Sequence, residues 1–122
     1  MKEVLYVFIG GGAGSVLRYA AGIAFRHLLP AHPFPWGTFT VNVAGCFLIG
    51  LFYAWADRFG LPDHMRLLLT AGLCGGFTTF STFCYEGIGL LKGGSYCLFF
   101  LYVVLSLLLG WIAVAGGAAL GK

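Results

Sequence analysis

Charged residues are scarce in this sequence. Aspartate, glutamate, lysine and arginine make up 9% of the 122 residues and hydrophobic residues 60%, whereas a soluble domain carries about 25% charged residues. So few charges cannot cover a surface that faces water, which argues against a soluble domain. The seven basic residues form no cluster or stripe, so nucleic acid is not an expected partner.

Paired cysteines and catalytic constellations are also missing. The four cysteines stand singly in apolar stretches, without Cys-x-x-Cys spacing or a neighbouring histidine, which argues against disulfides and a zinc site. We expect Cys46, Cys74, Cys84 and Cys97 to be small, buried packing residues. No His-Asp, Ser-His or paired-carboxylate arrangement is present, so an enzyme is not predicted.

Long apolar stretches fill most of the chain, whose mean hydropathy is +0.93. A spanning helix needs about 20 mainly apolar residues. Four stretches qualify, at residues 4–25, 37–56, 65–91 and 95–120. The first is too long for the apolar region of a signal peptide, which has about 7–15 residues. The sequence therefore predicts an all-α membrane protein with a single transmembrane domain over residues 1–122. Close helix packing is expected at Gly10–Gly14 and Gly72–Gly76, because their small-xxx-small spacing lets backbones approach.

The basic residues near the ends of the spans show only a weak bias toward one side of the membrane. Lys2, Arg58, Arg66 and Lys122 fall on the side of the termini, and Arg26 and Lys92 on the other. Since lysine and arginine in short loops set orientation, such a chain can insert either way round. This permits an antiparallel dimer without requiring one.

The third stretch has an unusual centre. Residues 72–83 read Gly-Leu-Cys-Gly-Gly-Phe-Thr-Thr-Phe-Ser-Thr-Phe. Gly75 and Gly76 loosen the backbone, and the hydroxyls compete for its hydrogen bonds. We predict an interrupted helix, whose free carbonyls could face a cation as in transporters. The alternative is a kinked helix whose hydroxyls bond back to their own carbonyls.

Several polar and aromatic residues inside the spans suit an anion path. Phe80 and Phe83 share a helical face, and the positive edges of their rings can border an anion; the alternative is a lipid or core position. The amide of Asn42 offers two donors, or else joins helices. In the last span, Tyr102 and Ser106 lie four residues apart on one face.

Arg18 and Glu86 are the charged residues inside the membrane, and each is by default a functional hypothesis. Arg18 could make a vestibule positive and draw anions in. It could instead extend to the membrane interface. The sequence does not decide the role of Glu86.

The chain resembles the CrcB/Fluc family of fluoride channels. The matching residues are Gly12-Ala-Gly-Ser-Val-Leu-Arg18-Tyr, then Gly37-Thr, Asn42 and Gly45, and above all Gly72 to Phe83. The resemblance implies an antiparallel, dual-topology homodimer with two pores in a bacterial plasma membrane, exporting fluoride passively. It also implies a structural sodium ion, held by the backbone carbonyls of Gly75 and Thr78.

The same resemblance implies roles for side chains. Fluoride would pass Phe80 and Phe83, with Asn42 as a polar contact, and Tyr102 and Ser106 would begin a polar track in the last span. Gly110 stands where another hydroxyl is expected in that track. The main alternative is a small dual-topology multidrug or cation antiporter. That activity calls for a carboxylate in the first span, where residues 4–25 contain Arg18 and no acid.

Overall fold

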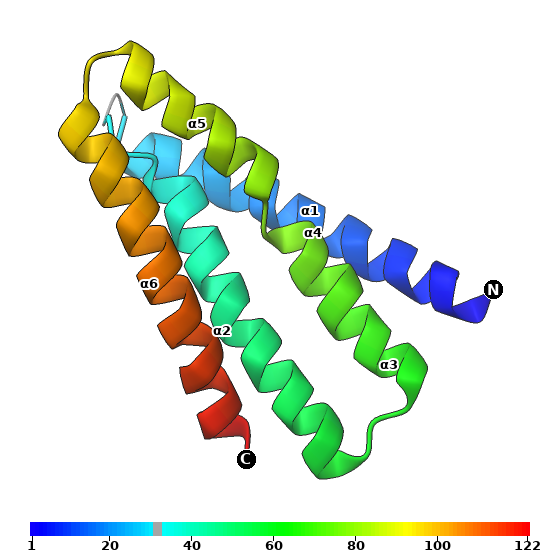
Figure 1. Ribbon diagram of the computed structural model, residues 1–122. Helices are drawn as coiled ribbons and strands as arrows, with labels where there is room; N and C mark the ends of the chain where they lie inside the picture. Colours follow the sequence, from blue (N-terminus) through cyan, green and yellow to red (C-terminus); the bar gives the residue numbers. More distant parts are fainter. Residues whose placement is uncertain (31–32) are drawn as a thin grey trace.

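The computed structural model describes residues 1–30 and 33–122, and the regular structure within them is helical (Figure 1). The helices are α1 (Lys2–Leu28), α2 (Trp36–Phe59), α3 (Asp63–Leu67), the π-helix η1 (Leu68–Cys74), α4 (Gly75–Phe77), α5 (Phe80–Lys92) and α6 (Tyr96–Gly121). Segments α3, η1, α4 and α5 together form one interrupted span. With α1, α2 and α6, this makes four helices long and apolar enough to cross a membrane, as predicted.

The expected limits of the spans lie within three residues of the observed helix ends. The helices extend past the apolar stretches through residues such as Arg26 and Arg58. Hydropathy marks the part of a helix that lies in hydrocarbon, whereas the helix itself continues into the interface. Helix α2 ends where Gly60 adopts the left-handed conformation, with φ of 61°.

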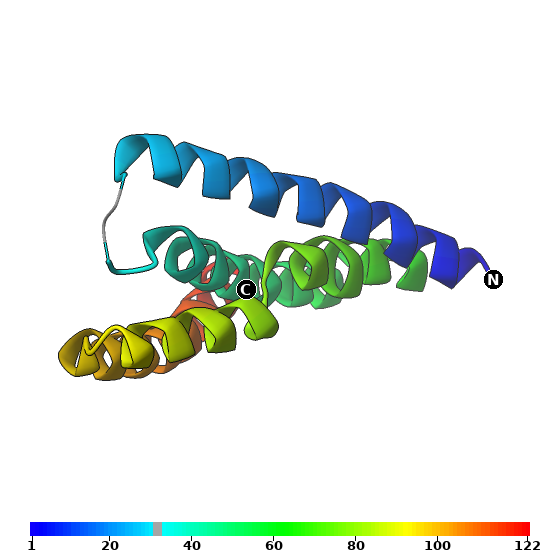
Figure 2. The ribbon, with the colours of Figure 1, turned by 90° about the horizontal axis from the view of Figure 1, so that it is seen from above.

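Helices α2 and α6 lie side by side along their length (Figures 1 and 2). Two glycines make this contact close: Gly50 lies against the carbonyl of Val114, and Gly117 against the carbonyl of Phe47. An added Cβ at either glycine would overlap that carbonyl, so these positions require glycine. Close backbone approach of this kind is how helices associate in lipid.

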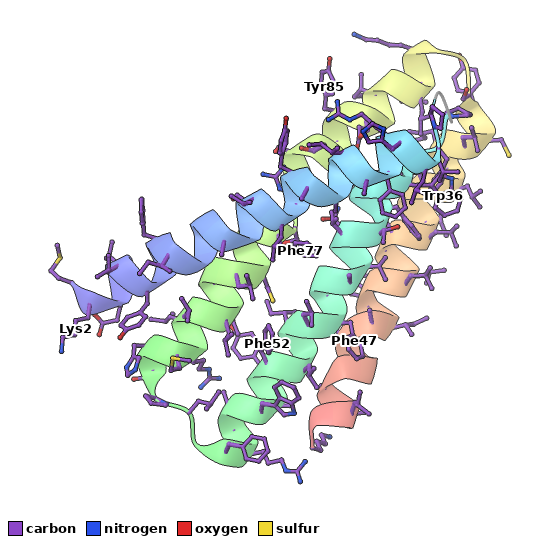
Figure 3. All side chains as sticks on the ribbon, turned by 180° about the vertical axis from the view of Figure 1, so that it is seen from behind. Lys2, Trp36, Phe47, Phe52, Phe77 and Tyr85 are labelled. Carbon is purple, nitrogen blue, oxygen red and sulfur yellow. The ribbon has the colours of Figure 1, made fainter. Side chains whose placement is uncertain are left out.

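Helix α1 crosses the first half of the interrupted span in a similar way (Figure 2). Gly10 contacts the carbonyl of Leu68 and Gly14 that of Leu73, and the Cα of Gly72 lies near Gly10. Phe77, in α4, lies at this crossing (Figure 3). The close packing expected from the spacing of Gly10–Gly14 and Gly72–Gly76 is confirmed.

The ends of the helices form two groups. The termini and the α2–α3 turn lie toward one end of the molecule, and the α5–α6 turn lies at the other (Figure 1). Few residues of α1 and α6 are buried within the chain. Their outer faces are therefore available to lipid or to another subunit.

The prediction that all four cysteines are buried is wrong for two of them. Cys74 is buried and Cys46 half-buried, but Cys84 and Cys97 are exposed on α5 and α6. Lipid is as apolar as a protein core, so a small apolar side chain gains little by leaving the lipid-facing surface. Burial rules drawn from soluble proteins do not apply there.

Candidate functional site

The third span is interrupted at Thr78 and Thr79. Helix α4 stops at Phe77 and α5 starts at Phe80. Between them Thr78 has φ −92° and ψ 159°, and Thr79 has φ −151° and ψ 125°, both extended. The Thr79 hydroxyl then accepts the backbone N–H of Thr82 at 3.3 Å and caps α5. The predicted break is present, and it replaces the alternative of a continuous, kinked helix.

Asn42 holds the extended backbone from the neighbouring helix α2. Its Nδ2 donates to the Thr79 carbonyl at 3.0 Å, and the Thr79 N–H donates to its Oδ1 at 2.8 Å. Backbone groups that leave a helix inside a membrane must find partners within the protein. Asn42 is such a partner, so one of the two interpretations weighed for it, a link between helices, describes its contacts.

The break releases backbone carbonyls, those of Gly75 and Thr78 among them, from helical hydrogen bonding. A continuous α-helix would direct the N–H of Thr79 to the Gly75 carbonyl and the N–H of Thr82 to the Thr78 carbonyl. Instead these two N–H groups donate to Asn42 and to the Thr79 hydroxyl. The carbonyls of Gly75 and Thr78 therefore lose the donors that a continuous helix would give them.

Two of the neighbouring carbonyls are occupied. The Cys74 carbonyl accepts both the N–H of Thr78 at 3.0 Å and its hydroxyl at 2.9 Å. The Gly76 carbonyl accepts Nε of Arg18 at 3.2 Å. Hydrogen bonding thus separates Gly75 and Thr78 from the occupied carbonyls of Cys74 and Gly76.

Arg18 borders a cavity of about 320 Å³ near the α1–α2 connection. Its guanidinium is bound to the C-terminal end of the first half of the interrupted span, where the helix dipole is negative. It therefore points to the break rather than out to the interface. The same cavity is lined by Arg26 from α1, Thr82 and Glu86 from α5, and Thr79 of the break.

A second cavity of about 310 Å³, here called the central cavity, lies on the other side of the break. Six predicted site residues line it: Asn42, Gly75, Thr78, Phe80, Phe83 and Ser106. Thr79 lines both cavities, so both border the break. Residues from α2, the interrupted span and α6 thus converge on one region.

Phe80 and Phe83 are neighbours on α5, with ring centroids 6.0 Å apart. The prediction that they share a face is confirmed. Their surroundings differ, because Phe80 is 78% exposed while Phe83 packs on the Tyr102 ring at 4.9 Å. Phe80 therefore projects beyond the chain, toward lipid or a second subunit.

Tyr102 and Ser106 differ in their contacts. Tyr102 is fully buried against Phe34, and its hydroxyl donates to Oε1 of Glu86 at 3.4 Å. Ser106, one turn further along α6, lines the central cavity. Its Oγ is buried and finds no hydrogen-bond partner within residues 1–30 and 33–122.

Three features of this region were not predicted. The π-helix η1, which widens the helix just before the break, has no marker in the residue pattern. The partner of Glu86 was left open and is Tyr102. Cys46, expected to be a packing residue, lines the central cavity. The mid-span position of Cys46, four residues after Asn42, was the one available signal.

Side chains suited to binding a metal ion do not cluster in the described part of the chain. Residues 1–30 and 33–122 contain no group of three or more His, Cys, Asp or Glu that could hold one. A cation near the break would therefore be held by oxygens of another kind. The carbonyls released at Gly75 and Thr78 are the hard oxygen donors that suit a small monovalent or divalent cation.

Comparison with known proteins agrees with the architecture. Residues 5–118 match the family model "CrcB-like protein, Camphor Resistance (CrcB)". The chain is 56% identical to a protein of Bacteroides fragilis named fluoride-specific ion channel FluC, over 100% of this chain and 98% of the relative. Proteins with the same name from Phocaeicola vulgatus and Leptospira interrogans are 51% and 48% identical, over 96% and 89% of this chain and 96% and 86% of their own lengths.

These matches extend over nearly all four helices, including the break and both cavities. The relatives are bacterial proteins named as ion channels, so this is a multi-pass bacterial membrane protein of a family of channels rather than enzymes. The chain belongs to the CrcB family.

Proposed function

We propose that this protein is a fluoride-selective channel through which fluoride leaves the cell passively. The observation that carries the proposal is the central cavity, where Asn42, Phe80, Phe83 and Ser106 converge beside a broken helix. The relatives named fluoride-specific ion channels support the choice of ion. Hydrogen fluoride enters cells from acidic surroundings and dissociates inside, so the fluoride gradient drives the ion outward.

The lining of the central cavity suits a small anion that must not be trapped. No lysine, arginine or carboxylate lines it in the part of the chain that the structure describes. Its polar groups are hydroxyls, an amide, thiols and backbone, and the rings of Phe80 and Phe83 present positive edges. Such weak donors replace water around fluoride without binding it tightly, as conduction requires. Arg18 supplies positive charge in the adjoining cavity, where it attracts anions toward the break.

A structural sodium ion fits the released carbonyls. Gly75 and Thr78 would contribute oxygens that the break has freed from the helix. Two carbonyls do not complete a cation's coordination, and a second copy of the chain would supply two more. The ion would neutralise the carbonyl ends of the broken helices and hold the two breaks together.

We further propose an antiparallel homodimer with two pores. The weak bias of basic residues toward one end permits insertion in both orientations. The exposure of Phe80 and Tyr85, at 78% and 81%, supports the proposal that α5 contacts a second subunit. Tyr85 points away from the bundle (Figure 3).

The antiporter alternative has little support. Its exchange chemistry needs a free carboxylate in the membrane, and residues 4–25 contain none. Glu86 is the acidic residue available in mid-span, and it accepts a hydrogen bond from the Tyr102 hydroxyl. Proton-coupled uptake of a cationic dye without fluoride conduction would favour this alternative.

A growth assay tests the function in cells. Bacteria that lack their own fluoride exporters should grow in acidic, fluoride-containing medium when they express this protein, and should stop growing when they express the Phe83→Ile variant at equal level. Equal growth with and without the protein would contradict the proposal.

Sodium and orientation need separate measurements. Purified protein should keep its dimer peak and its flux in sodium buffer and lose both when sodium is replaced by N-methylglucamine. Single cysteines introduced near Lys122, in a cysteine-free background, should react with an impermeant reagent from both sides of the membrane. Reaction from one side alone would rule out dual topology.

A further inference from the structure

Most polar side chains that line the central cavity already form hydrogen bonds with backbone groups at the break. Both polar atoms of the Asn42 amide bond to the Thr79 backbone, which leaves one N–H. The Thr78 hydroxyl donates to the Cys74 carbonyl, and the Thr79 hydroxyl caps Thr82. These groups hold the backbone, which leaves one N–H of Asn42 and the O–H of Thr79 for other partners.

Ser106 and Cys46, which line the central cavity from α6 and α2, do not bond to the backbone of the break in this way. Oγ of Ser106, on α6, is buried, lines the cavity and has no partner among the described residues. Cys46, on α2, lines the same cavity as a half-buried free thiol. An unpaired hydroxyl inside a membrane is costly unless something that enters the cavity accepts its hydrogen bond.

The position of Gly110 shows where the Cys46 thiol lies relative to Ser106. It lies one turn beyond Ser106 on α6, is buried, and a Cβ added there would lie 3.5 Å from Sγ of Cys46. The thiol therefore lies against α6 about one turn from the Ser106 hydroxyl, opposite a position that has no side chain. Together they give the α2–α6 wall two donors in succession along the cavity.

We propose that Cys46 borders the anion route and that its S–H continues the line of donors that begins at Ser106. This inference rests on the proposed channel function and adds one residue to its path. A neutral thiol is a weak donor. It can assist a passing anion without holding it, which is the property that a conducting path needs.

A pore-lining thiol can be modified from within the cavity. Benzyl methanethiosulfonate is neutral and apolar, so it reaches sites inside a membrane protein. The Cys46 thiol releases its proton to water, and its sulfur attacks the reagent and displaces methanesulfinate, forming a disulfide to the benzylthio group. The thiol sulfur is oxidised and the sulfonyl sulfur reduced, so no other reactant is needed. The product removes the S–H donor and puts a benzyl group in the cavity.

The experiment measures fluoride efflux from liposomes before and after treatment with this reagent. The wild-type protein should lose at least about tenfold in rate, and dithiothreitol should restore it. Cys46→Ser keeps a donor but does not react, so it should conduct and resist the reagent; Cys46→Ala should resist it also. Cys84→Ala and Cys97→Ala are matched controls, because their thiols are exposed on the outer faces of α5 and α6; they should remain sensitive.

Mass spectrometry of the treated protein locates the label. The proposal is overturned if Cys46 carries the label while flux is unchanged, if Cys46 stays unlabelled, or if block persists in both Cys46 variants. Block that disappears in Cys74→Ala but persists in Cys46→Ser would assign the route to the other thiol of the cavity. Absence of fluoride efflux before any treatment would instead contradict the channel function itself.

Discussion

Gly45 of α2 lies directly against the side chain of Thr78, at the point where the third span is broken. A Cβ at Gly45 would occupy the position of Thr78 Cγ2 and would come within 3.4 Å of the Phe77 ring. Thr78 cannot turn away freely, because its hydroxyl donates to the Cys74 carbonyl and its β-branched side chain is stiff. Because Gly45 of α2 has no side chain, the Thr78 side chain has room to pack against α2 at the break.

Gly45→Ala should therefore disturb the break. Forcing an extra methyl group into a packed contact costs about 1–3 kcal/mol, and Thr78 would move together with its carbonyl. We expect a lower midpoint of thermal unfolding and slower fluoride efflux. Gly12→Ala is the matched control, since a Cβ at Gly12 meets nothing within 4 Å; it should behave as the wild type. Equal stability of the two variants would show that the Gly45 contact is unimportant.

Phe80→Ile and Phe83→Ile should each block fluoride flux and leave a folded protein. Isoleucine is apolar and of similar bulk but has no ring edge to face an anion. Phe8→Ile is the control for Phe80, because Phe8 is 77% exposed and Phe80 78%. It should leave efflux unchanged. Normal flux in both pore variants, measured at equal protein density in liposomes, would refute the assignment of these rings.

Asn42→Asp should slow fluoride efflux by about tenfold or more, since it loses one hydrogen bond and gains a charge. The carboxylate keeps an acceptor for the Thr79 N–H but loses the donor to the Thr79 carbonyl. It also adds negative charge to the lining of the central cavity. Efflux and the gel-filtration profile are measured together, so that loss of fold is separated from loss of conduction. Unchanged efflux in a folded variant would argue against this position on the route.

Arg18→Gln should lower the efflux rate at low ionic strength by about tenfold if Arg18, as we propose, concentrates anions beside the break. The difference from wild type should shrink as an impermeant salt is added and screens the charge. Arg66→Gln is the control; Arg66 is half-exposed on α3 and 3.9 Å from Asp57, and should have no such effect. A salt-independent loss in Arg18→Gln would point to its bond with Gly76 instead.

The four spans, the break and the glycine contacts could be predicted because each depends on a local property. Twenty apolar residues, a run such as Gly75 to Thr79, and the spacing of Gly10 and Gly14 carry physical consequences wherever they occur in a membrane. The gathering of Asn42, Phe80, Phe83 and Ser106 around one cavity came from the resemblance to a family.

Whether an individual side chain faces protein or lipid could not be predicted. In a helix that is apolar all round, the residues give no sign of which side meets protein and which meets lipid, so Cys46 and Cys84 look alike in the sequence. Tertiary hydrogen bonds were equally hidden. The bonds of Asn42 to Thr79 and of Tyr102 to Glu86 join residues 37 and 16 positions apart.

Fluoride-selective conduction is measured as anion efflux from liposomes that contain the purified protein. The liposomes are loaded with fluoride or with chloride and diluted into gluconate, with an ionophore that dissipates the membrane potential. We expect rapid loss of fluoride, no measurable loss of chloride, and no loss of either from vesicles that carry Phe83→Ile. Retention of fluoride by the wild-type vesicles, or equal release of the two ions, would contradict fluoride-selective conduction.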